Sequence, residues 1–185
     1  MSMVSLFTGE TAPASVKQFF ANGNPGPIAS SLSHIPDIMQ KALPFISATL
    51  GPSKIDIRTK EIVILRASAL QQCRFCVNTH SFVARNSGLT RNEVMSLRRS
   101  DDGMKAFESE REKALIRWTN AVAIGPQSVT DELKQEFKSQ FSEAEVVELT
   151  LLVGATILLN RYATALDLPV AATHVEFLRN EGLVF

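Results

Sequence analysis

Apolar residues recur at spacings of three and four along most of the chain, which is the pattern of helices that bury one face. The stretch 110–124 places Ala114, Leu115 and Trp118 on one side of such a helix. The apolar run 149–159 predicts a buried core helix. Half-buried strands alternate apolar and polar residues, and the sequence contains no such alternation. The pattern therefore predicts an all-α fold.

Several polar residues mark where these helices begin. Asp56 is a good N-cap for a helix that runs to about residue 71. Thr90 and Ser142 are each followed three positions later by glutamate, which predicts a capping box at each site. Thr130 precedes a short helix. A helix over about 73–86 is expected to end at Gly88, which can adopt the left-handed conformation of a helix cap.

Prolines and glycines give the remaining boundaries. Pro36 fits the first turn of a helix, Pro44 is expected to interrupt that helix, and Pro169 is expected to open the last one. The cluster of asparagine, glycine and proline at 22–27 predicts a break after a short helix near 16–21.

We divide the chain on this basis into residues 1–30, an N-terminal arm with a short helix, and residues 31–185, an all-helical domain. The arm contains Val4, Leu6 and Phe7, which we expect to dock on a partner subunit.

A degenerate internal two-fold repeat is a further hypothesis. Leu50-Gly51-Pro52 recurs as Ile124-Gly125-Pro126, and Glu61-Ile62-Val63 resembles Glu145-Val146-Val147. In the second register, Ile157, Asn160 and Thr164 would take the places of Cys73, Cys76 and His80. Such a repeat would leave the chemistry in one half of the fold and make the other half a scaffold.

Composition narrows the classes of function. The 185 residues include 19 basic and 19 acidic side chains, so there is no positive excess of the kind that nucleic-acid-binding proteins carry. The N-terminus lacks the basic and apolar segments of a signal peptide, and the longest apolar run is too short to span a bilayer. We therefore expect a cytoplasmic protein with no membrane or nucleic-acid partner, in which two cysteines act as a redox or metal pair.

Candidate chemistry is concentrated between Glu61 and His80. Cys73 and Cys76 are the only cysteines, and His80 follows four positions later. On a helix that opens at Cys73, the two thiols and the imidazole lie on one face. A helix N-terminus, a second nearby cysteine and a histidine each lower a thiol pKa, and the thiolate is the reactive form. Glu61 is the candidate for orienting His80 and accepting its proton.

Two other interpretations of the cysteine pair stay open. Structural zinc sites usually have four protein ligands, and here the two cysteines and His80 supply three. Glu61, His34 or His174 would have to be the fourth. The pair could also be inert core, but its spacing from His80 and Glu61 favours redox chemistry over both alternatives.

The pattern of Glu61, Cys73, Cys76 and His80 resembles the alkylhydroperoxidase D family, within the carboxymuconolactone-decarboxylase-like superfamily. The resemblance covers roughly residues 30–170. Segments on both sides of the cysteine pair also match the family: Leu50-Gly51-Pro52, Asp56, Arg58, Glu61-Ile62-Val63, Gly88-Leu89-Thr90, Val147-Glu148-Leu149 and Asn160 to Leu166. It implies a helical alkylhydroperoxidase D-like fold and the activity of a thiol-dependent peroxidase, without a cofactor or metal.

The resemblance also implies roles for the four residues. Cys76 would attack the peroxide oxygen and become a sulfenic acid, and Cys73 would supply a proton and then form the disulfide with Cys76. Glu61 and His80 would form the proton relay. The implied partners are a hydroperoxide substrate, a dithiol reductant that is either a lipoyl protein or thioredoxin-like, and further copies of the chain in a homo-oligomer.

One position departs from the family's pattern. Well-known members carry a second histidine just before the second cysteine, where this chain has Phe75. The relay therefore has one titratable group fewer, which puts peroxidase efficiency and the natural reductant in doubt. Two alternatives remain: a carboxymuconolactone-decarboxylase-type lyase, against which the cysteine pair argues, and a non-enzymatic helical oligomer that senses redox state or binds a metal.

Overall fold

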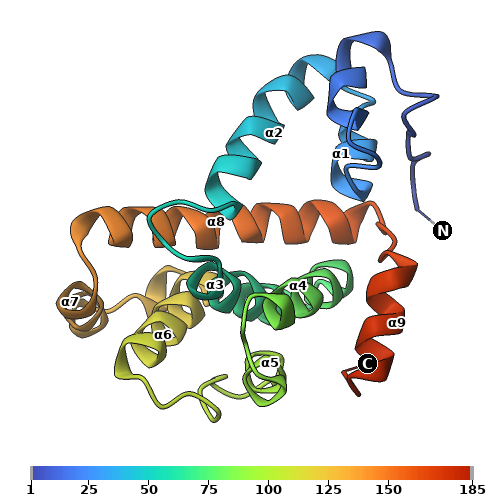
Figure 1. Cartoon of the computed structure of the whole chain (residues 1–185). Helices are drawn as coiled ribbons and strands as arrows, with labels where there is room; N and C mark the ends of the chain where they lie inside the picture. The colour runs from blue at the N-terminus through green and yellow to red at the C-terminus, as the bar shows by residue number, and fades with distance from the viewer. Residues whose placement is uncertain (1, 184–185) are drawn as a thin grey trace.

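A computed structural model describes residues 2–183, so the first residue and the last two of the chain lie outside it. Within the described residues the secondary structure is helical, as predicted, and contains no strand (Figure 1). The helices are η1 (Ala14–Phe20), α1 (Pro27–Leu32), α2 (Pro36–Leu50), α3 (Ile57–Leu70), α4 (Arg74–Asn86), α5 (Arg91–Leu97), α6 (Glu110–Ile124), η2 (Pro126–Ser128), α7 (Asp131–Gln140), α8 (Glu143–Ala165) and α9 (Ala172–Asn180).

The long helix α8 lies between two layers (Figure 1). On one side η1, α1 and α2 form an N-terminal lobe, and on the other α3, α4, α5 and α6 form the main bundle. The main core joins α3, α6 and α8 through buried residues such as Ile62, Leu115 and Leu152. Because α8 packs on α2 as well as on α3 and α4, it is buried on more than one side, as its apolar sequence predicts.

The N-terminal lobe has an apolar cluster of its own, built around Val16, Phe20, Leu32 and Met39. Leu6 and Phe7 of the arm pack against their own chain, and the Phe7 ring lies on His34 with the centroids 4.6 Å apart. Both side chains stay partly exposed, so docking of the arm on a partner subunit stays a prediction. The division of the chain at residue 30 stays a prediction.

Most helix starts are confirmed. Asp56, Thr90 and Ser142 accept hydrogen bonds from backbone amides of the first turn, and the capping boxes at Thr90 and Ser142 are complete. Gly88 follows α4 with a φ of +92°, a backbone conformation that favours glycine.

Two predictions about proline are wrong, and one helix was missed. Helix α2 continues through Pro44, because the carbonyl that this residue cannot bond belongs to Gln40, on the exposed side of the helix. Helix α9 begins at Ala172, three residues after Pro169. The short helix α1, with Pro27 in its first turn, was not predicted, and it begins where the predicted break at 22–27 ends.

The suggested internal repeat is not matched in the backbone. Residues 143–165 form one continuous helix, whereas the corresponding segment 61–80 breaks between α3 and α4. The two segments therefore present their side chains differently. By length and composition α8 could also cross a membrane, but this is weak evidence, since buried core helices pass the same test and α8 lies between two packed layers.

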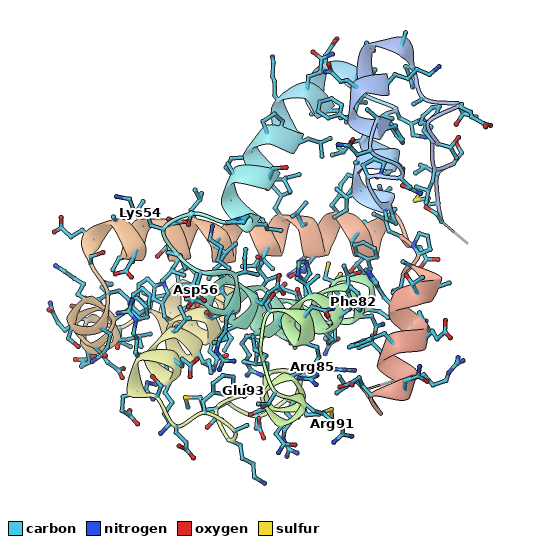
Figure 2. All side chains as sticks on the ribbon, viewed as in Figure 1. Lys54, Asp56, Phe82, Arg85, Arg91 and Glu93 are labelled. Atoms are coloured by element: carbon cyan, nitrogen blue, oxygen red, sulfur yellow. The ribbon has the colours of Figure 1, made fainter. Side chains whose placement is uncertain are left out.

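Helix α4 is held on its outer face by α9. Figure 2 shows Phe82 on α4 pointing toward α9, where its ring stacks on His174 with centroids 4.2 Å apart and meets Phe177 edge to face at 5.0 Å. Arg85, one turn later, binds the Glu181 carboxylate at 2.9 Å. These contacts fix the face of α4 that points away from its cysteines.

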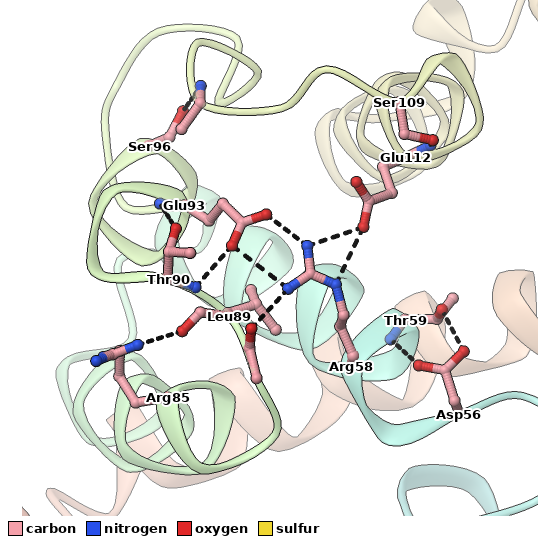
Figure 3. A network of polar contacts seen from close by, with 12 residues as sticks. Asp56, Arg58, Thr59, Arg85, Leu89, Thr90, Glu93, Ser96, Ser109 and Glu112 are labelled. Carbon is pink, nitrogen blue, oxygen red and sulfur yellow. Dashed lines mark hydrogen bonds and ion pairs between the residues drawn. The ribbon is translucent and has the colours of Figure 1, made fainter.

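Arg58 connects the start of α3 to two other helices (Figure 3). Its guanidinium binds the carboxylate of Glu93 in α5, donates to Glu112 Oε1 in α6 at 3.0 Å, and donates to the Gly88 carbonyl at 2.9 Å. The planar guanidinium suits such multiple contacts. Arg58 thereby fixes the α4–α5 turn relative to the helix that carries Glu61.

Candidate active site

A sharp turn between α3 and α4 brings the predicted residues together. Helix α3 ends at Leu70, and Gln72 adopts a φ of +55°, which reverses the chain. The Cys73 amide then donates to the Ser68 carbonyl at 3.1 Å, and Cys73 becomes the N-cap of α4. Helix α4 therefore folds back along α3, which places the cysteines beside the end of α3 and His80 beside Glu61, nearer its start.

The two thiols are in direct contact. The Sγ atoms of Cys73 and Cys76 lie 2.7 Å apart, and the Cys76 amide donates to Cys73 Sγ at 3.3 Å. Both cysteines are buried and free. The helix N-terminus also favours negative charge on Cys73.

The two thiols of the pair differ in pKa. The hydrogen bond from the Cys76 thiol lowers the pKa of Cys73 to about 6, although burial acts in the opposite direction. The same hydrogen bond, together with burial and the charge on Cys73, raises the pKa of Cys76. At neutral pH Cys73 is therefore the thiolate and Cys76 keeps the proton.

His80 and Glu61 form the second half of the site. Nδ1 of His80 lies 3.1 and 3.0 Å from the two carboxylate oxygens of Glu61, which is only 3% exposed. Burial by itself lowers the pKa of His80, but the charge and hydrogen bond of Glu61, together with Cys73, outweigh it and raise the pKa. The dithiol thus has a protonatable imidazole beside it that is oriented by a buried carboxylate.

A cavity of about 230 Å³ opens onto this group. Cys76, His80 and Phe75 of α4 line it, with Asn160 of α8 and Ser68 of α3. Its opposite wall consists of apolar side chains of the N-terminal lobe, which we call the roof: Ile28 of α1, and Leu43, Ile46 and Leu50 of α2. The cavity is smaller than the roughly 300–1,000 Å³ typical of drug-sized ligands, so it suits a small apolar molecule.

Phe75 separates this cavity from a second one. The second cavity, of about 380 Å³, lies between α4, the end of α8 and α9, and its lining includes Arg74, Asn78, Thr164 and Asp167. Phe75 lines both cavities, whereas Cys76 and His80 line only the smaller one. The residue that replaces the family's second histidine is therefore the wall between an apolar and a more polar space.

The structure brings Glu61, Cys73, Cys76 and His80 into one place, and their catalytic roles stay predictions. His34 instead bonds the Ser5 carbonyl at 2.9 Å, and His174 stacks on Phe82, so neither completes a zinc site. No three His, Cys, Asp or Glu side chains within residues 2–183 are arranged to hold a metal ion.

Asn160 also belongs to the site, although the sequence pattern did not predict a role for it there. Its side chain is buried beside the dithiol, and it lowers the pKa of both cysteines by hydrogen bonding. The signal was present, because an amide in the middle of an apolar helix needs a polar partner. The sequence could not say which partner that was.

Replacing Glu61 by glutamine is expected to make the dithiol less acidic. Without the carboxylate, burial lowers the pKa of His80, so the thiolate loses a positive neighbour and the pKa of Cys73 rises. Because the thiolate reacts, the rate of alkylation increases with pH through this pKa, and its midpoint should move from about 6 upward by roughly one pH unit. Iodoacetamide alkylation measured against pH tests this, with the exposed Glu143→Gln change as control. An unshifted midpoint in Glu61→Gln would show that the relay does not act on the thiols.

Comparisons with known proteins find likenesses in family and in fold. Residues 36–121 match the carboxymuconolactone decarboxylase family. YdfG, an uncharacterized protein of Bacillus subtilis strain 168, is 28% identical over 115 residues, which are 62% of this chain and 77% of YdfG. In other curated relatives the matched segment spans 63% or 37% of the relative's length.

Solved structures extend the likeness to nearly the whole chain. The alkylhydroperoxidase AhpD core of a peroxidase-related protein from Ralstonia eutropha JMP134 superposes with a TM-score of 0.82 at 17% identity, over 99% of this chain and 97% of that one. A cysteine-to-alanine variant of the debrominase Bmp8, in complex with 2,3,4-tribromopyrrole, gives a TM-score of 0.75 at 19% identity, over 98% and 100% of the two chains. At these identities the likeness concerns the fold.

Proposed function

Because the chain is an AhpD-like protein of the carboxymuconolactone decarboxylase superfamily, we propose that it is a thiol-dependent peroxidase that reduces hydroperoxides with Cys73 and Cys76. The observation that carries the proposal is a dithiol in contact at 2.7 Å whose Cys76 faces an apolar cavity beside the His80–Glu61 pair. No metal or cofactor takes part in this reaction.

The reaction begins with a proton transfer within the pair. Cys76 passes its proton across the 2.7 Å contact to the Cys73 thiolate, so the negative charge moves to the sulfur that lines the cavity. Cys76 Sγ then attacks the outer peroxide oxygen and the O–O bond breaks. Cys76 becomes a sulfenic acid, and the leaving alkoxide takes a proton from His80 or Cys73.

The disulfide forms in the second step. Cys73 Sγ attacks the sulfenic sulfur of Cys76, the S–O bond breaks, and the hydroxide leaves as water after taking a proton. The sum is one dithiol and one hydroperoxide giving one disulfide, one alcohol and one water. A dithiol reductant then restores the pair by exchange, and we propose a lipoyl-bearing or thioredoxin-like partner in the cytoplasm for this step.

Counting free thiols during a titration of the reduced protein with cumene hydroperoxide tests the proposal. Two thiols per chain should disappear within seconds to minutes, and mass analysis should find an internal Cys73–Cys76 disulfide. Thiols that stay free after long exposure would overturn the peroxidase proposal.

Reductive dehalogenation is a second candidate, favoured by the small apolar cavity and by the fold shared with Bmp8. The same dithiol would supply the two electrons. Overall, one brominated substrate and two thiols would give a product with a carbon–hydrogen bond in place of the carbon–bromine bond, one disulfide and one hydrogen bromide. Bromide release from 2,3,4-tribromopyrrole, together with loss of two thiols and no reaction with cumene hydroperoxide, would favour this candidate.

We also propose that the chain forms a homo-oligomer through an exposed apolar surface of α8 and α2. On α8 it consists of Val147, Leu151, Gly154 and Leu158, spaced by four, three and four residues, and Phe45 of α2 borders the same groove. Val147 is 68% exposed and Leu158 60% exposed. Side chains of this size and spacing are typical of helix pairing, and Gly154 lets backbones approach closely.

The charges at the two ends of this surface favour a second copy as the partner. Glu143 and Arg161 are both exposed and lie on the same side of α8, about 27 Å apart along the helix. In an antiparallel pair of α8 helices, Glu143 of one copy lies near Arg161 of the other. The surface is therefore complementary to itself.

Replacing Leu151 by glutamate is expected to dissociate the oligomer, because it places two like charges at the centre of the antiparallel pair. Sedimentation velocity at micromolar concentration should show the wild type as an oligomer and the variant as a monomer. Ile124→Glu is the matched control, since Ile124 is 68% exposed but lies outside this surface. A monomeric wild type would refute the proposed assembly.

A further inference from the structure

Phe75 lies between the two cavities at the first turn of α4. It stands between Cys73 and Cys76 in the sequence, and its side chain is partly exposed. It lines both the small cavity of about 230 Å³ and the larger one of about 380 Å³. Among the described residues, no other side chain lines both. The ring of Phe75 is therefore the part of the wall that the two cavities share.

The small cavity opens to solvent on the side of the N-terminal lobe, because its lining residues Pro25 and Ser47 are exposed. Phe75 belongs to the wall across from the roof, next to Cys76. A molecule that enters between α1 and α2 therefore meets the reactive sulfur and the Phe75 ring at the far side of the cavity.

Beyond the ring lies a different kind of space. The larger cavity is lined by polar side chains such as Arg74 and Asn78 of α4 and Thr164 of α8, together with Val175 and Leu178 of α9. Neither Cys76 nor His80 borders it. A ligand that extended into this space would leave the neighbourhood of the dithiol.

The wall at Phe75 limits how much of a chain the small cavity can bury. Each methylene that moves from water into an apolar space increases the affinity of a ligand about fourfold. Methylenes that find no room inside stay in water and add nothing. The position of the far wall therefore determines the chain length at which the affinity stops rising.

We propose that Phe75 is a specificity-determining residue, whose ring is a partition that confines the substrate's apolar body to the small cavity. The substrates are compact apolar molecules such as cumene hydroperoxide, and long unbranched chains fit only in part. Without the ring the two cavities become continuous. As the ligand is the substrate of the proposed reaction, this inference deepens the proposed function and rests on it.

Binding of straight-chain alkanols to the reduced protein tests the partition without any redox step. Titrations from 1-butanol to 1-dodecanol are followed by the amide chemical shifts of residues around the small cavity. In the wild type the affinity should rise with chain length and then level off. In Phe75→Ala the rise should continue for about two further methylenes, so the ratio of long-chain to short-chain affinity should be about fifteenfold larger.

Two variants are the controls. Val175→Ala widens the larger cavity but leaves the partition in place, so its alkanol affinities should level off at the same chain length as in the wild type. Phe75→Tyr keeps the ring and should keep that limit as well. The same limit in the wild type and in Phe75→Ala would overturn the inference, as would an equal lengthening in Val175→Ala.

The wild type decides the question if Phe75→Ala fails to fold. A long alkanol should shift the amide signal of Ile46, which borders the small cavity, and leave those of Val175 and Leu178 unchanged. Equal shifts at Ile46 and Val175 would show that the ring does not separate the two spaces.

Thiol oxidation separates this inference from the peroxidase proposal. The wild type should react faster with cumene hydroperoxide than with dodecyl hydroperoxide, and Phe75→Ala should reduce that preference. A longer alkanol limit in Phe75→Ala, with thiols that react with neither hydroperoxide, would refute the peroxidase proposal alone. An unchanged limit with normal thiol oxidation would refute the partition alone.

Discussion

A Cys73→Ser protein is expected to react with cumene hydroperoxide and to stop at a sulfenic acid, whereas a Cys76→Ser protein is expected to keep its remaining thiol. Cys76 lines the cavity that admits the peroxide, while Cys73 is 0% exposed and borders neither cavity. Loss of the attacking sulfur should slow thiol oxidation by about 10³-fold or more, the scale seen when an enzyme's nucleophile is removed.

The two variants are distinguished by the product and not only by the rate. Trapping with dimedone should label Cys76 in the Cys73→Ser protein, because no second thiol is present to form the disulfide. Its reaction should also be slower than that of the wild type at neutral pH, since the Cys73 thiolate that accepts the Cys76 proton is gone. If Cys73 were labelled in the Cys76→Ser protein instead, the more acidic thiol would be the nucleophile and the assigned roles would be reversed.

Replacing Lys60 by methionine is expected to lower the free energy of unfolding by about 3 kcal/mol, the lower end of the range for breaking a buried ion pair. The Lys60 ammonium is 0% exposed, lies 2.8 Å from Glu148 Oε1 on α8, and donates to the carbonyls of Thr49 and Gly51 at 3.0 and 2.7 Å. Methionine keeps the apolar stem but leaves these acceptors without a donor. Because Glu148 is 30% exposed, water offsets part of the loss.

Urea unfolding followed by circular dichroism measures this change. Lys134→Met is the control, since Lys134 forms an exposed pair with Asp131 on α7, and its loss should leave the free energy of unfolding nearly unchanged. The double change Lys60→Met with Glu148→Leu should recover part of the stability, because it removes the carboxylate left unpaired. A loss below about 1 kcal/mol for Lys60→Met would show that the buried contact is energetically neutral.

The sequence predicted those parts of the fold that local chemistry decides. Capping side chains at Asp56, Thr90 and Ser142 mark helix starts because each satisfies amides of its own first turn. Helix α2 continues through Pro44 against its local preference, and the carbonyl left unbonded belongs to Gln40 on the exposed side, where water can reach it. Helix α1 was missed because six residues carry too little periodicity, and it is stabilised by packing in the N-terminal lobe.

The sequence predicted four residues of the candidate site but not the contribution of Asn160. Glu61, Cys73, Cys76 and His80 lie within twenty residues, so one helix reversal at Gln72 brings them together. Asn160 joins them from α8, about eighty residues later in the chain, and only the packing of α8 across α3 and α4 reveals this. The difference in pKa between the two thiols depends on the direct contact of their Sγ atoms, which residue spacing alone does not predict.

The roof and the reacting groups belong to different parts of the fold, which is useful for protein engineering. The reacting groups belong to α3, α4 and α8, while the apolar wall facing them comes from α1 and α2, whose lobe has its own hydrophobic cluster. Exchange of residues 12–50 between relatives would therefore replace the roof together with its own hydrophobic cluster, and change which molecules enter, while leaving the residues that carry the reacting groups in place. The same dithiol could be redirected to new substrates by grafting one short, self-packed module.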